Sequence, residues 1–205
     1  MKKYTVMLIA ALGLANARVH ADEPMPACHM SQAAAQQDQH ASESEQGAGN
    51  YRAPAVHLVD QSGAQVDLVK LLATTRPIAL NFIFTSCRTI CPVLSASLAS
   101  LHRQMGDEVD YVSISIDPEF DTPAQLRGYQ KRFDVGPHWT LLTGKLEDVI
   151  AVQKAFDAYY GGKNGHKALT FTRPAGSRDW KRFEGFPATA ELASSLRAKM
   201  GAAEP

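Results

Sequence analysis

The distribution of apolar residues divides the chain into a short apolar start, a polar segment and one long mixed region. Residues 22–50 contain no Val, Ile, Leu, Phe, Tyr or Trp. Such a stretch cannot bury enough apolar surface to offset the entropy that is lost when a chain becomes ordered. We therefore expect a disordered arm over residues 22–50 and one folded domain over residues 51–205, an ordinary size for a single domain.

Two nearly continuous apolar runs, 77–84 and 109–116, are typical of strands buried on both faces of a sheet. Weaker patterns predict further strands at 56–60, 64–66, 140–142, 166–172 and 180–186, the first two forming a hairpin, and helices at 67–73, 92–105, 123–133, 145–159 and 191–200. Strands that alternate with helices in this order predict an α/β fold, with a central sheet flanked by helices.

The apolar start has the features of an export signal. Lys2 and Lys3 precede the apolar run 6–14, and small residues follow it up to Ala21. A bilayer-spanning helix needs about 20 apolar residues, so this run is too short to remain as a stable membrane span. We expect residues 1–21 to be a signal peptide cleaved after Ala21, and the mature protein to be periplasmic.

Charge and cysteine content exclude two classes of protein. The 21 basic and 21 acidic residues balance, and loss of residues 1–21 would leave 18 basic against 21 acidic side chains, because Lys2, Lys3 and Arg18 are removed. A slightly acidic chain does not have the basic surface on which nucleic-acid binding depends. Three cysteines are too few for a disulfide scaffold, and their odd number leaves one thiol unpaired within the monomer.

Cys87 and Cys91 lie where the strand predicted at 77–84 passes into a helix. Ligands of α/β folds bind outside the carboxyl ends of strands, and a helix start stabilises thiolates, as does the neighbouring Arg88. If the segment is helical, both sulfurs lie on one face and can share a soft ion such as Cu(I). Reversible disulfide exchange is the alternative, whereas a structural disulfide would gain little by closing so short a loop.

A neutral imidazole would complete a three-ligand copper site, but the sequence pattern alone does not select one. His57, His102 and His138 have no local reason to face the cysteines, and His166 follows a glycine-containing loop at the start of a predicted strand. The arm carries further soft or borderline metal ligands, namely Cys28, His29 and Met30, with Met25 and His40 nearby. These residues either capture metal weakly or belong to a simple spacer.

Several motifs occur in a fixed order along residues 54–200. They are Phe84-Thr85-x-Cys87-x-x-x-Cys91-Pro92, the segment 113–123 (SISIDPEFDTP), Tyr129, Trp139 followed by 142–144 (LTG), and His166 before an apolar strand. Together they resemble the Sco/SenC family of copper proteins. The resemblance implies a thioredoxin-like fold with a mixed sheet and a hairpin insertion, and a copper ion held by Cys87, Cys91 and His166.

The same resemblance implies a function in copper delivery. The expected recipient is the dinuclear centre of cytochrome c oxidase subunit II or another copper protein, and a periplasmic copper donor would supply the ion. Because some members look like thiol reductases that prepare the cysteines of a copper-site target, a thiol–disulfide oxidoreductase is the alternative, and whether the protein is an enzyme stays open. A copper- or redox-responsive signalling module is a third possibility.

The chain departs from the family pattern near the expected ligands. Arg88 and Thr89 stand where members usually have Pro and often Asp, and Gly165 and Lys167 replace the common neighbours of the histidine. Two acidic residues in the segment 113–123 also need an explanation. Asp117 ends the second central strand and is expected to support the ligands or contact a partner, whereas Asp121 is expected to cap the next helix.

Overall fold

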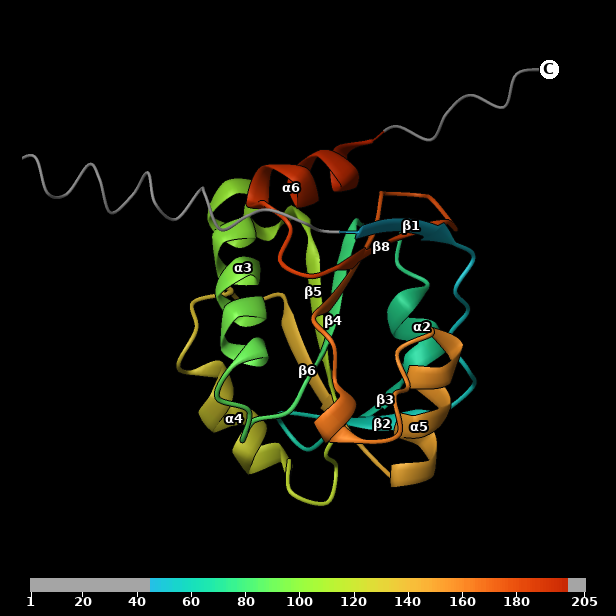
Figure 1. Ribbon diagram of the computed structural model, residues 1–205, viewed down its shortest axis with the longest axis vertical. Coiled ribbons are helices and arrows are strands. Elements are labelled where there is room, and N and C mark those ends of the chain that lie inside the picture. The colour runs from blue at the N-terminus through green and yellow to red at the C-terminus, as the bar shows by residue number, and fades with distance from the viewer. Residues whose placement is uncertain (1–44, 199–205) are drawn as a thin grey trace, which may run out of the picture.

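An eight-stranded mixed sheet runs through the part of the chain that the computed structural model describes, residues 45–198, with the strand order β1-β8-β7-β4-β5-β6-β2-β3 (Figure 1). The strands are β1 (Glu45–Gly49), β2 (His57–Asp60), β3 (Gln65–Asp67), β4 (Ile78–Ile83), β5 (Asp110–Ser115), β6 (Trp139–Thr143), β7 (Leu169–Arg173) and β8 (Trp180–Glu184). β4, β5 and β6 are parallel, and the remaining pairings are antiparallel. The predicted mixed α/β sheet is thus confirmed.

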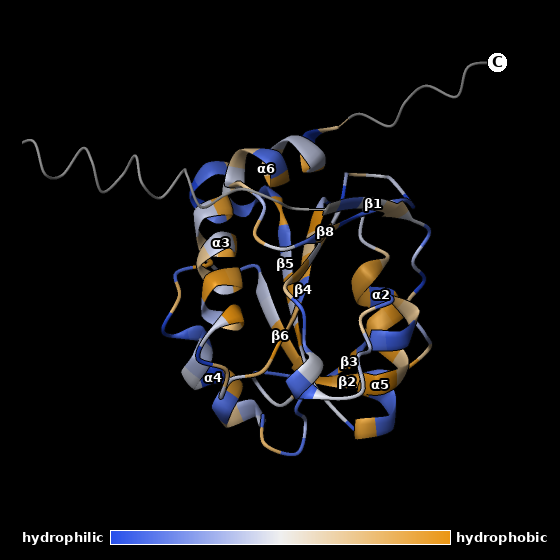
Figure 2. Ribbon diagram, viewed as in Figure 1, coloured by the Kyte–Doolittle hydropathy of each residue, from blue (hydrophilic) through white to orange (hydrophobic). Residues whose placement is uncertain are grey.

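Helices cover both faces of this sheet. They are α2 (Leu68–Leu72), α3 (Ile90–Met105), α4 (Pro123–Gln130), α5 (Leu146–Ala155) and α6 (Thr189–Arg197), with the 3₁₀ turns η1 (Gly106–Glu108) and η2 (Lys163–Gly165). Figure 1 shows α3, α4 and α6 on one side of the sheet and α2 and α5 on the other. Figure 2 shows that the helices turn apolar positions towards the strands and polar positions outwards. None of the helices in residues 45–198 is long and apolar enough to span a bilayer.

The central strand β4 explains why the core has two halves. All six of its residues are buried, and they alternate between the faces, as successive strand residues must. Ile78, Leu80 and Phe82 pack into the cluster beneath α2 and α5. Ala79 and Ile83 pack into the cluster beneath α3, α4 and α6. This burial fixes the carboxyl end of β4, from which the cysteine segment continues.

Part of the expected disordered arm forms a strand in the structure. Glu45–Gly49, which we expected to be the end of the disordered arm 22–50, forms β1 and pairs along its full length with β8. A strand at a sheet edge is stabilised by backbone hydrogen bonds to one neighbour, so it can form without the apolar side chains that the sequence pattern requires. The expected signal peptide 1–21 and residues 22–44 of the arm lie outside the described residues.

Several helix boundaries differ from the predictions by one to four residues, and those of α3 and α5 have a clear physical reason. α3 begins at Ile90, two residues before the predicted start, because Pro92 is compatible with the first turn of a helix. α5 ends at Ala155 instead of continuing to residue 159, and Asp157 just beyond it has a φ of 49°. The left-handed conformation of Asp157 ends the helix before the glycines that were expected to stop it.

Candidate metal centre

The two cysteines lie on either side of the start of α3. Cys87 precedes the helix, in a turn where its backbone N–H donates to the Phe84 carbonyl over 3.1 Å, and Cys91 is in the first helical turn. The condition under which both sulfurs would share one helical face is therefore not met, but the two thiols still lie within hydrogen-bonding reach of each other. The N-cap residue Thr89 makes no side-chain cap bond, and the Cys91 backbone N–H instead donates to Cys87 Sγ over 3.4 Å.

The pKa values of the two thiols are shifted in opposite directions. Burial alone would raise the pKa of the half-buried Cys87, but hydrogen bonds from the backbone N–H groups of Cys91 and Thr89 and from the Cys91 thiol outweigh it, so the pKa is lowered. Burial raises the pKa of Cys91, which is 0% exposed, although the Phe84 N–H donates to its sulfur over 3.4 Å. Cys87 is thus the more accessible and more readily ionised of the two thiols, and Cys91 is the buried one.

A buried carboxylate anchors the cysteine loop, residues 84–89 between β4 and α3. Asp121 does not cap α4, because that position belongs to Thr122, whose hydroxyl accepts the Gln125 N–H over 3.3 Å. The Asp121 carboxylate instead accepts the Thr85 N–H at 3.0 Å, the Thr85 hydroxyl at 2.5 Å and the Ser115 hydroxyl at 2.6 Å. It therefore joins the end of β5 to the start of the cysteine loop. The sequence reasoning missed this network, although all three residues lie in the quoted motifs.

Tyr129, another residue of the quoted motifs, supports the helix that carries Cys91. Its hydroxyl donates to the Cys91 carbonyl over 3.1 Å and lies 2.8 Å from Ser95 Oγ. Tyr129 is 1% exposed, so these two polar contacts satisfy a hydroxyl that would otherwise be buried without a partner.

The Asp117 carboxylate contacts the loop that precedes His166. Lys163 in η2 donates to Asp117 Oδ2 over 2.7 Å, and the Lys163 carbonyl accepts the His166 N–H over 3.3 Å. The pair therefore connects the end of β5 to the loop that carries the histidine. Asp117 was expected to support the ligands or contact a partner, and its contact with Lys163 places it next to the histidine loop.

His166 lies against Phe84, the residue that directly follows β4. Its ring packs edge-on against Phe84, with the ring centroids 5.9 Å apart. Burial lowers the pKa of His166 to about 4, against the opposite effect of a hydrogen bond to the Phe82 backbone. The Nε2 atom is buried and, within residues 45–198, has no hydrogen-bond partner. A neutral imidazole with an unpartnered nitrogen is the form in which histidine binds metals.

The three residues implied by the resemblance are near one end of the sheet but are not assembled as a ligand set. Within residues 45–198, no three His, Cys, Asp or Glu side chains come close enough to hold a metal ion. Cys87 and Cys91 meet, and His166 contacts Phe84 instead. The auxiliary candidates Cys28, His29 and Met30 lie outside the described residues.

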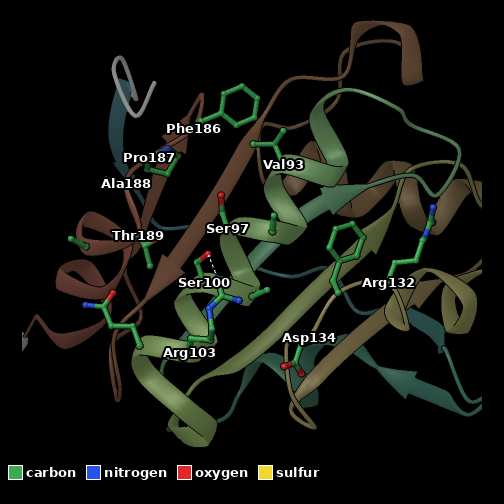
Figure 3. A pocket seen from close by; sticks show the side chains of 15 residues that line it. Val93, Ser97, Ser100, Arg103, Arg132, Asp134, Phe186, Pro187, Ala188 and Thr189 are labelled. Atoms are coloured by element: carbon green, nitrogen blue, oxygen red, sulfur yellow. Dashed lines mark hydrogen bonds between the residues drawn. The ribbon is translucent and has the colours of Figure 1, made fainter. Parts of the chain in front are cut away.

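A large hollow lies beside α3, and neither Cys87 nor Cys91 lines it. It lies between α3, the segment after α4 and the segment that leads into α6, and Figure 3 shows Val93, Phe186 and Arg132 around it. Its lining contains neither cysteine nor His166. Val93 is 45% exposed only two residues after Cys91, so the hollow and the cysteine loop share the same helix. This surface is therefore not the candidate ligand site.

Sequence comparison with known proteins finds relatives among SCO1 and SenC proteins. Residues 44–173 match the model of the SCO1/SenC family. A SCO1 protein homolog of Bacillus subtilis is 33% identical over 105 residues, or 49% of this chain and 53% of that protein. SenC of Rhodobacter capsulatus is 32% identical over 106 residues, or 50% of this chain and 46% of that protein. The matched segment thus spans about half the length of these curated relatives.

Solved structures extend the similarity over more of the fold. A SCO1/SenC family lipoprotein from Bacillus anthracis is 25% identical, with a TM-score of 0.64 over 73% of this chain and 95% of that one. The ScoI of Bradyrhizobium japonicum, solved with copper bound, is 28% identical, with a TM-score of 0.56 over 71% of this chain and 97% of that one. These likenesses confirm the thioredoxin-like arrangement of the sheet and its helices. From the sequence match and the shared fold together, the chain belongs to the SCO1/SenC family.

Proposed function

We propose that the protein is a periplasmic copper metallochaperone that binds Cu(I) through Cys87, Cys91 and His166. The observation that carries this proposal is the pairing of an accessible, thiolate-prone Cys87 with Cys91, beside a neutral His166 whose Nε2 has no partner among the described residues. Thiolate sulfur and imidazole nitrogen are soft to borderline ligands that suit Cu(I). The copper-bound structure of the related ScoI supports the assignment of the ion.

Binding of Cu(I) requires two changes in these side chains, a loss of a proton and a movement. The buried Cys91 thiol must give up its proton, so uptake of the ion releases protons and strengthens as the pH rises. His166 and the two sulfurs must also approach one another, because no such group is assembled within residues 45–198. A site that forms only around its ion can also open again, which delivery to another protein requires.

The recipient that we propose is a copper protein, specifically the dinuclear centre of cytochrome c oxidase subunit II. Cys87 is half-buried rather than enclosed, so a thiolate of the recipient can replace it on the ion and begin transfer by ligand exchange. A periplasmic donor would load the protein after export and cleavage of residues 1–21. Cys28, His29 and Met30 would assist capture of the ion.

A thiol–disulfide oxidoreductase is the second candidate, and the opposite pKa shifts of the two cysteines favour it. The Cys87 thiolate would attack a target disulfide and form a mixed disulfide with one target cysteine. Cys91 would then attack the Cys87 sulfur and release that target cysteine as a thiol. The target gains two thiols, and the pair becomes a Cys87–Cys91 disulfide. The Sco family member BsSco, 25% identical with a TM-score of 0.59, is described as having a disulfide switch.

A Cu(I) competition experiment separates the two functions. The reduced chain is titrated against a strong Cu(I) chelator as wild type, His166→Ala, Cys87→Ser and the control His57→Ala, which alters an exposed histidine. We expect His166→Ala to weaken binding by at least about tenfold while disulfide reduction persists, because only copper binding needs the imidazole. Equal affinity of wild type and His166→Ala, with an intact ability to reduce a disulfide, would overturn the metallochaperone assignment.

A further inference from the structure

A second hollow lies at the opposite end of β4 from the cysteines. Its volume is about 350 Å³, and it is lined by α2, by the segment after β1 and by residues of β7 and β8. Arg173 in its lining pairs with Ile78 at the start of β4, whereas the cysteine loop follows the end of that strand, about 16 Å away at the rise of a β-strand. An inference about this hollow is therefore independent of the proposed copper function.

Arg173 is a buried cation whose charge is not neutralised by direct contact. Arg173 is only 8% exposed, and its Nε is buried and has no hydrogen-bond partner within residues 45–198. Its Nη2 donates to the Thr74 carbonyl over 2.9 Å, and the guanidinium lies 5.1 Å from the Trp180 ring centroid. Asp110 attracts it at longer range but is itself hydrogen-bonded to Arg76 over 2.8 Å. Burial of a cation without a contacting anion is costly, so the position favours an anion.

Two more guanidinium groups complete a positive rim. Arg52 and Arg178 line the same hollow, both are exposed, and neither forms an ion pair with a carboxylate of residues 46–198. No Asp or Glu is among the described residues of the lining. Guanidinium groups bind carboxylate and phosphate oxygens through paired N–H donors, which makes three of them around one hollow a suitable cradle for an oxyanion.

The remaining lining is mostly apolar and limits the kind of anion. Val69 and Leu72 of α2 and Trp180 contribute to it, and the arginines are the charged residues among the described lining. We propose that this hollow, the arginine pocket, binds a small organic anion. Its carboxylate or phosphate would contact Arg52, Arg173 and Arg178, and its apolar part would rest against Val69, Leu72 and Trp180.

The two tryptophans of the chain provide a built-in probe and control. Trp180 lines the pocket, whereas the Trp139 indole N–H donates to Ser113 Oγ over 2.9 Å in the other half of the core. In ¹H–¹⁵N spectra of the full chain, we expect benzoate to shift the Trp180 indole signal in a saturable manner and to leave that of Trp139 in place. Acetate and inorganic phosphate should bind more weakly than benzoate, because they lack the apolar part.

The variants keep the fold because the altered residues are exposed. Arg52→Gln with Arg178→Gln should weaken benzoate binding by at least about tenfold, and Arg103→Gln, an exposed arginine on α3, should leave it unchanged. Shifts that never saturate, or equal affinity in the double variant, would overturn the proposal. Sedimentation with phosphatidylglycerol vesicles tests a lipid headgroup as the ligand. If the wild type sediments with the vesicles, the double variant does not, and benzoate does not bind saturably, the pocket binds a lipid headgroup. That result would refute the proposal of a small organic anion.

Discussion

Replacement of Asp121 should destabilise the fold and loosen the cysteine loop. The carboxylate is 0% exposed and accepts hydrogen bonds from the Thr85 N–H, the Thr85 hydroxyl and the Ser115 hydroxyl. A hydrogen bond to a charged group contributes about 1.5–3 kcal/mol, but the cost of burying the charge offsets part of the total. In Asp121→Ala the hydroxyls can reorient, whereas the Thr85 N–H loses its acceptor. We therefore expect a loss of about 3 kcal/mol in the free energy of unfolding.

Urea unfolding at pH 7 measures this loss, and two variants calibrate it. Asp121→Asn keeps the volume and one acceptor oxygen, so it should cost less than Asp121→Ala. Thr122→Ala removes the true cap of α4 and should cost about 1 kcal/mol. Hydrogen exchange of the Thr85 amide should accelerate in Asp121→Ala beyond the change in global stability. Unfolding of Asp121→Ala within about 0.5 kcal/mol of wild type, with Thr85 equally protected, would refute the anchoring role.

Three further predictions concern the metal-free protein. Iodoacetamide should label Cys87 before Cys91, with a midpoint below the ordinary thiol pKa of about 8.5, and equal labelling of both would contradict the opposite pKa shifts. Lys163→Met should accelerate hydrogen exchange of the His166 amide with little change in global stability, because it removes the contact with Asp117; unchanged exchange would show that this contact does not hold the loop. The lowered pKa of His166 means that the unfolded chain takes up a proton first, so stability should fall as the pH drops from about 6.5 to about 4. Urea unfolding across that range should show a smaller fall in His166→Gln.

The sequence predicted the parts of the fold that depend on burial. The apolar runs 77–84 and 109–116 became β4 and β5, since a strand buried on both faces must be apolar along its length. β1 was missed because an edge strand depends on backbone hydrogen bonds, which leave no apolar pattern.

The candidate site was predictable only in part. The spacing of Cys87 and Cys91 indicated a shared site at a strand end, and the structure places the two thiols within hydrogen-bonding reach of each other. The role of Asp121 was not predictable from local sequence, because its partner Thr85 lies 36 residues away and a helix cap was the nearer explanation. His166 was selected by resemblance alone, since a lone histidine carries no spacing signal, and its place as a ligand stays a prediction.

X-ray absorption spectroscopy at the copper edge of the Cu(I)-loaded full chain tests the central proposal most directly. The proposal predicts two sulfur ligands and one nitrogen ligand, with the nitrogen contribution lost in His166→Ala and sulfur lost in Cys87→Ser. A spectrum with three sulfurs that is unchanged in His166→Ala, or one without sulfur, would contradict the assignment of Cys87, Cys91 and His166 as the copper ligands.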